Sequence, residues 1–155
     1  MPQLLHRIKR SFPVELPPTG LSRYPGSDHE ATKLFSTRRW IDISASELRE
    51  NSDAVGYFTA EALAYFAPAY MTAYLTDSSA LDMAVESFLL NLGAAPDMES
   101  PELDRARRVK SLFNDEQRGV VETFVMHYLH VEGSCALGIA EPAMWVYGIT
   151  APSGS

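Results

Sequence analysis

Three side chains in the last third of the chain could do chemistry if the fold brought them together: His127, His130 and Cys135. Three-residue spacing places both histidines on roughly one side of a helix, and Glu132 follows closely. Imidazole, thiolate and carboxylate are zinc ligands, so a metal ion is geometrically possible. Spacing alone is a weak indication, however, and the chain has no second cysteine. We therefore predict no metal site and no cofactor.

The same residues allow Cys135 to act as a nucleophile with a histidine as its base. No glycine-flanked nucleophile turn accompanies the cysteine, and a lone cysteine commonly packs as a small apolar side chain. Phosphate-loop and dinucleotide glycine patterns are also missing from the sequence. We therefore predict no catalytic residue and expect a protein that is not an enzyme. A small hydrolase that uses Cys135 or a histidine-bound metal is the least favoured alternative.

Charge is more informative than these clusters. The chain of 155 residues carries 20 acidic and 13 basic side chains, a net charge of −7, and 46% of its residues are apolar. Such a balance argues against nucleic acid as a partner, since lysine and arginine supply affinity for phosphate backbones. Residues 51–104 contain no lysine or arginine but nine carboxylates: Asp53, Glu61, Asp77, Asp82, Glu86, Asp97, Glu99, Glu102 and Asp104.

Tyrosines gather in the same acidic segment. Some of them are expected on an exposed face, where aromatic anchors inside an acidic rim would form a protein interface; the alternative is that they are core aromatics with hydroxyls at the rim. A basic protein is the partner that this surface would fit. The residues predicted to bind it are Asp53, Tyr57, Glu61, Tyr70, Tyr74, Asp77, Asp82 and Glu86.

Helical patterns position these residues. The segment Ala62 to Leu75 is apolar nearly all round, which indicates a helix that is buried in the centre or offers a second face to a partner, such as another copy of the chain. We expect Pro68 to kink it. A helix over 80–92 should stop at a left-handed Gly93. Helix starts are predicted at capping signals: Ser44 with Glu47, Thr59, Ser100 before Pro101, and Asn114 with Gln117.

These patterns predict a mainly α protein, a single compact helical domain over residues 1–155. It should hold five or six helices and leaves room for one short strand pair. An amphipathic helix over 3–11 has Leu4, Leu5, Ile8 and Phe12 near one side and its basic residues on the other. Residues 13–26 form a proline- and glycine-rich loop, and residues 133–155 form a C-terminal tail. Within this tail, Glu141-Pro142 could start a final helical turn, or Met144 to Ile149 could form a strand.

The cellular compartment is predicted from features that the sequence lacks. A single cysteine cannot form an internal disulfide, and no apolar run approaches the roughly 18 to 20 residues of a membrane span. The N-terminal residues lack the order of a signal peptide. We therefore expect a cytoplasmic protein that does not bind membranes.

Several segments resemble a family of small bacterial proteins of unknown function: Trp40-Ile-Asp-Ile43, Phe58-Thr-Ala-Glu-Ala62, Tyr65-Phe-Ala-Pro-Ala-Tyr70, Glu116-Gln-Arg-Gly-Val-Val121, Phe124 and His127-Tyr-Leu129. The resemblance covers about Asp28 to His130. These are packing motifs, so the resemblance implies a fold and a bacterial origin and carries over no catalytic residue. In size and charge the chain is also similar to immunity proteins that neutralise toxins.

We therefore expect an acidic protein-binding inhibitor, an immunity protein that occludes the active site of a basic toxin such as a nuclease. The alternative is a non-catalytic adaptor or structural protein that forms a homodimer through Ala62 to Leu75.

Overall fold

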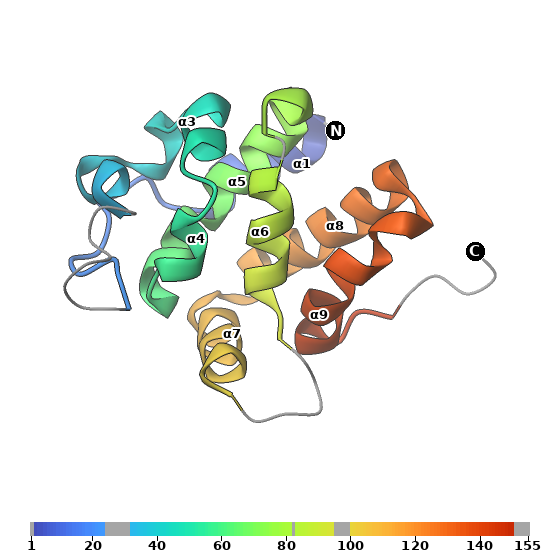
Figure 1. Ribbon diagram of the computed structural model, residues 1–155. Helices are drawn as coiled ribbons and strands as arrows, with labels where there is room; N and C mark the ends of the chain where they lie inside the picture. The colour runs from blue at the N-terminus through green and yellow to red at the C-terminus, as the bar shows by residue number, and fades with distance from the viewer. Residues whose placement is uncertain (1, 24–31, 82, 95–99, 151–155) are drawn as a thin grey trace.

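The computed structural model describes residues 2–23, 32–81, 83–94 and 100–150, and these are mainly helical (Figure 1). The described residues contain no strand; an isolated antiparallel bridge joins Ser22 to Phe58 instead of the short strand pair that the sequence allowed. The α-helices are more numerous than the five or six expected: α1 Pro2–Ser11, α3 Ala45–Glu50, α4 Ala54–Tyr57, α5 Ala60–Leu81, α6 Met83–Leu92, α7 Pro101–Leu112, α8 Asp115–Glu132 and α9 Leu137–Tyr147. Three short 3₁₀ helices cover Lys33–Thr37, Trp40–Asp42 and Ser134–Ala136.

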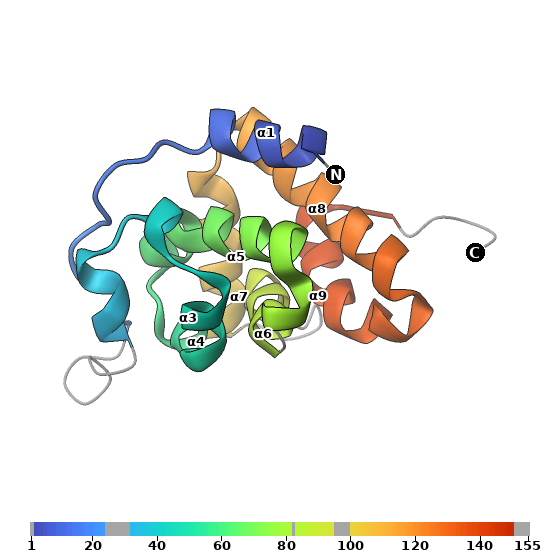
Figure 2. The ribbon, with the colours of Figure 1, turned by 90° about the horizontal axis from the view of Figure 1, so that it is seen from above.

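Helix α5 runs through the centre of the molecule. Figure 2 shows α1 and α8 on one side of it and α3, α4 and α6 on the opposite side. Helix α5 contacts α1, α3, α6 and α7, and its side chains are buried on every side, from Leu63 and Phe66 to Met71. The apolar composition all round this helix therefore indicates a central position.

The capping predictions are confirmed. Ser44 with Glu47 and Asn114 with Gln117 form reciprocal capping boxes at the starts of α3 and α8. The Thr59 hydroxyl accepts a hydrogen bond from the Ala62 amide at 3.1 Å, which caps α5. Ser100 caps α7 ahead of a proline at the first helical position. These motifs are confirmed because each needs only residues within one turn.

Of two predictions about helix interruptions, the left-handed Gly93 is wrong and the kink at Pro68 stays a prediction. Helix α5 continues through Pro68, and the residue with non-helical dihedrals is Asp77, at φ −156° and ψ 67°. Gly93 does not adopt a positive φ. A Cβ atom there would lie 2.1 Å from the backbone carbon of Pro142, so the glycine lets α6 and α9 approach closely.

The predicted C-terminal tail is also wrong for residues 134–147. Most of it is helix α9, whose buried residues include Ala140, Ala143 and Tyr147, and Pro142 lies inside it. Helix α9 packs beside α6, and both run downward in Figure 1. The loop predicted over 13–26 is confirmed for its described part, residues 13–23, which contains no helix. No helix in the described ranges is long and apolar enough to cross a membrane.

Candidate functional site

Two of the predicted partner-binding residues are core residues. Tyr70 is fully buried and stacks on Phe88 of α6, with ring centroids 5.0 Å apart. Tyr74 is 6% exposed, packs edge-on against Phe124 at 5.6 Å and donates its hydroxyl to Glu132 at 2.5 Å. The prediction that these tyrosines are surface anchors is wrong, because α5 is covered from every side. A homodimer through Ala62 to Leu75 loses its contact surface for the same reason.

The predicted carboxylates are spread over the molecule. Asp53, Glu61 and Asp77 are exposed, Tyr57 is half-buried, and Asp82 lies outside the described residues. Glu61 and Asp77 stand near opposite ends of α5, about 24 Å apart at 1.5 Å of rise per residue. That separation exceeds the Debye length of about 8 Å at physiological salt, so these two charges act independently.

Helix α6 brings a smaller set together, which we call the α6 stripe: Met83, Glu86 and Leu90. Met83 and Leu90 are 62% and 46% exposed, although both side chains are large and apolar. Glu86 lies three residues after the first and four before the second, so all three share one face of the helix. The opposite face of α6 is buried. The stripe therefore offers two apolar side chains with a carboxylate between them.

The charges of three carboxylates, one of them Glu86, act on two buried tyrosines. Burial, and then the charges of Glu86 and Glu132, raise the pKa of Tyr128 to about 12. Burial, and then the charge of Asp53, raise the pKa of Tyr70, which stacks beneath α6. Asp53 directly precedes α4, which packs on α6.

The two histidines lie in the last turns of α8, and Cys135 lies in the 3₁₀ helix that follows. His127 is half-buried with its ring 6.4 Å from that of Tyr74, and burial lowers its pKa. His130 and Cys135 are exposed, and the Cys135 thiol donates to the backbone oxygen of Glu132 at 3.4 Å. Within the described part of the chain, no three His, Cys, Asp or Glu side chains are placed to hold a metal ion.

A groove of about 530 Å³ lies between the first turns of α5 and α7. Its charged lining mixes Arg23, Arg105 and Arg108 with Glu102 and Asp104. The Arg105 guanidinium turns inward: it donates to the backbone oxygens of Phe58 at 2.8 Å and Val55 at 3.2 Å, and to the Asn91 side chain. Arg105 therefore ties α7 to the α4–α5 junction and to α6.

Fold and surface together define a small helical protein that exposes apolar side chains on one face of α6. The chain belongs to a family of unknown function, DUF6714, whose model matches residues 20–145. Membership in a family of unknown function is thus confirmed, and the match extends beyond the expected Asp28 to His130 at both ends. No curated protein and no solved structure matches the chain.

Sequence reasoning missed Met83 and Leu90, although a signal for them was present. The core stripe of this helix consists of Ala84, Val85, Phe88, Leu89 and Leu92. Met83 and Leu90 fall outside it and share the face of Glu86, which was already a candidate. Large apolar residues outside a complete core stripe are the pattern that would have identified the surface.

Proposed function

We propose that this protein binds a basic protein partner through the α6 stripe and thereby inhibits it. The observation that carries the proposal is the pairing of exposed Met83 and Leu90 with Glu86 on one helix face. The chain segment around them, residues 51–104, has no lysine or arginine. In its most concrete form, the protein is a bacterial immunity protein that occludes the active site of a basic toxin such as a nuclease.

Charged and apolar side chains would contribute to binding in different ways. Carboxylates on and beside α6 would attract a basic surface and raise the association rate, by about 10- to 1,000-fold in known cases. Buried apolar side chains at the centre of an interface supply most of the affinity, while the surrounding polar contacts exclude water. Met83 and Leu90 are the side chains suited to that central position.

The test uses the basic protein encoded by the adjacent gene, because an immunity protein is expected beside its toxin. The toxin would be prepared as an inactive variant and its association measured at 50 and 500 mM salt. We expect the association rate to fall by about tenfold or more at high salt. We also expect Leu90→Lys to weaken binding by about 100-fold.

Leu16→Lys is the matched control, since Leu16 is 76% exposed and lies in the linker after α1. That variant should bind within about twofold of the wild-type chain. Equal losses for the two variants, or an association rate that does not respond to salt, would contradict the proposal.

A further inference from the structure

The opposite side of the molecule carries a second surface, which helix α1 covers. Helix α1 packs on α8 and α5 (Figure 2), and Leu4, Ile8 and Phe12 are buried beneath it. These residues are spaced four apart and form one apolar stripe. Residues 2–11 precede the part of the chain that matches the family. The α5 and α8 face therefore lies within the matched part of the chain, whereas its cover lies outside it.

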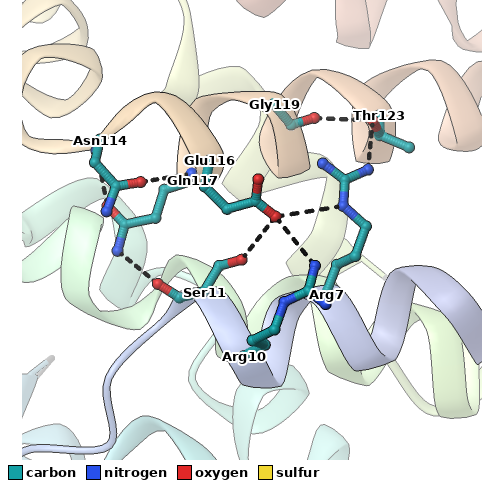
Figure 3. A network of polar contacts seen from close by, with 8 residues as sticks. All are labelled: Arg7, Arg10, Ser11, Asn114, Glu116, Gln117, Gly119 and Thr123. Carbon is teal, nitrogen blue, oxygen red and sulfur yellow. Dashed lines mark hydrogen bonds and ion pairs between the residues drawn. The ribbon is translucent and has the colours of Figure 1, made fainter.

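The polar contacts of α1 with α8 centre on Glu116 (Figure 3), and the Ser11 carbonyl also accepts from Gln117 Nε2 at 3.0 Å. Glu116 lies 3.7 Å from Arg7 Nε and 3.5 Å from Arg10 Nη2, and it accepts the Ser11 hydroxyl at 3.3 Å. Arg7 also donates to the Thr123 hydroxyl at 3.4 Å. Because the Glu116 side chain is 49% exposed, these contacts are weak and screened by salt.

The linker after α1 is held separately from the helix. Residues 13–16 are exposed, yet the Pro13 carbonyl accepts from Trp40 Nε1 at 3.0 Å and the Glu15 carbonyl accepts from the Tyr65 hydroxyl. Neither contact involves a residue of α1. The helix can therefore leave its face while the linker stays in place, which makes its release a local opening.

We propose that the face of α5 and α8 beneath α1 is a binding site for a basic amphipathic helix, which the chain's own α1 occupies until a partner helix displaces it. The composition of helix α1 indicates the chemistry of this ligand. It carries Arg7, Lys9 and Arg10 and no acidic residue, next to its apolar stripe. Charge complementarity with Glu116 selects a basic partner. This site is separate from the α6 stripe and does not depend on the function proposed for it.

The probe is a fluorescent synthetic peptide of residues 3–14, titrated into the full chain and into its Ile8→Asp variant. An aspartate on the apolar stripe should release α1 and free the face. The peptide should then bind the variant at least tenfold more tightly than the wild-type chain, whose face is occupied. A control peptide that carries both Leu4→Asp and Ile8→Asp should bind neither chain.

Two outcomes of the titration would overturn the proposal: equal affinity for both chains, and equal binding by the control peptide. If the variant loses its circular dichroism, hydrogen exchange on the wild-type chain decides. Amides of residues 6–11 should then exchange at least tenfold faster than those of residues 120–128. Exchange of both segments at one common rate would mean that α1 opens only with the whole fold, and the proposal would fail.

Discussion

The two sides of α5 carry surfaces of similar composition, one of them exposed and the other covered by a helix. On one side, α6 exposes Met83 and Leu90 with a carboxylate between them. On the other side, α8 also combines apolar contacts with a carboxylate, Glu116, but α1 covers them with its own apolar and basic residues. The covered face shows what an occupied site of this kind looks like, so it guides what to expect of the open one.

Stability should also differ between the two sides, because the number of contacts differs. Helix α6 contacts α4, α5, α7 and α9, whereas α1 contacts α8 and α5. An element at the end of the chain with few neighbours opens at lower free energy than one that is packed from several directions. Substitutions on the two sides can therefore test the comparison.

The largest difference should come from two core truncations. Leu89→Ala in α6 removes a fully buried side chain and should lower the free energy of unfolding by about 3 to 4 kcal/mol. Ile8→Ala, equally buried, should lower it by only about 1 kcal/mol, because α1 can detach first. Urea unfolding measures both values, and equal losses would contradict the comparison.

Gly93→Ala should be nearly as severe. The added methyl group would lie 2.1 to 2.4 Å from backbone atoms of Pro142 and Ala143, so the two helices must separate. We expect a loss of about 3 kcal/mol in unfolding free energy. Gly138→Ala in α9 is the control, because nothing lies within 4 Å of the added atom there. A control variant that is no more stable than Gly93→Ala would argue against this packing.

Arg105→Met tests the tie between α7 and the α6 side. Loss of the guanidinium leaves the buried carbonyls of Val55 and Phe58 without this donor, which should cost about 2 kcal/mol in thermal or urea unfolding. The exposed Arg108→Met should change stability by less than about 0.5 kcal/mol. Similar effects of the two substitutions would show that Arg105 has no special role.

High pH should weaken the protein through its buried tyrosines. The pKa of Tyr128 is raised to about 12, against about 10 in an unfolded chain, so the unfolded state releases this proton first. The contribution of protonated Tyr128 to the free energy of unfolding is complete below pH 10 and is lost as the pH rises towards 12. In Tyr128→Phe, the free energy of unfolding should fall less steeply with pH, by about 1.4 kcal/mol per pH unit. Urea unfolding at pH 9, 10 and 11 measures it, and an unchanged slope would contradict the assignment.

The smallest effect should come from Glu116→Gln beneath α1. Its ion pairs are half-exposed, so the change in unfolding free energy should stay below about 0.5 kcal/mol. The salt dependence of amide exchange in α1 should disappear, whereas the exposed Glu50→Gln should preserve it. Persistent salt dependence in the Glu116 variant would point to other charges as the anchor of α1.

Local signals predicted the fold better than the surface. Capping pairs such as Ser44 with Glu47 and the stripe of Leu4, Ile8 and Phe12 involve residues within a few turns, so the sequence contains all that they need. Only a final helical turn from Glu141-Pro142 was considered for α9, because a proline is common at a helix start, whereas here Pro142 lies inside the helix.

The candidate site depends on long-range packing, which cannot be predicted from local patterns in one sequence. Tyr70 and Tyr74 stand on a helix that is apolar all round, so no polar face indicates which side is exposed. Gly93 carried a local stop signal, yet its neighbour is Pro142, 49 positions later. The orientation of α6, and with it the stripe, follows from that contact.

The close contact at Gly93 also matters during synthesis. Helix α6 leaves the ribosome before α9, so its flank against Pro142 and Ala143 stays uncovered until α9 has been made. A chain that stops before residue 137 would expose this apolar flank next to Met83 and Leu90 and would be prone to aggregate. The surface proposed to recognise a partner thus shares its helix with a flank that is covered only once α9 has been made.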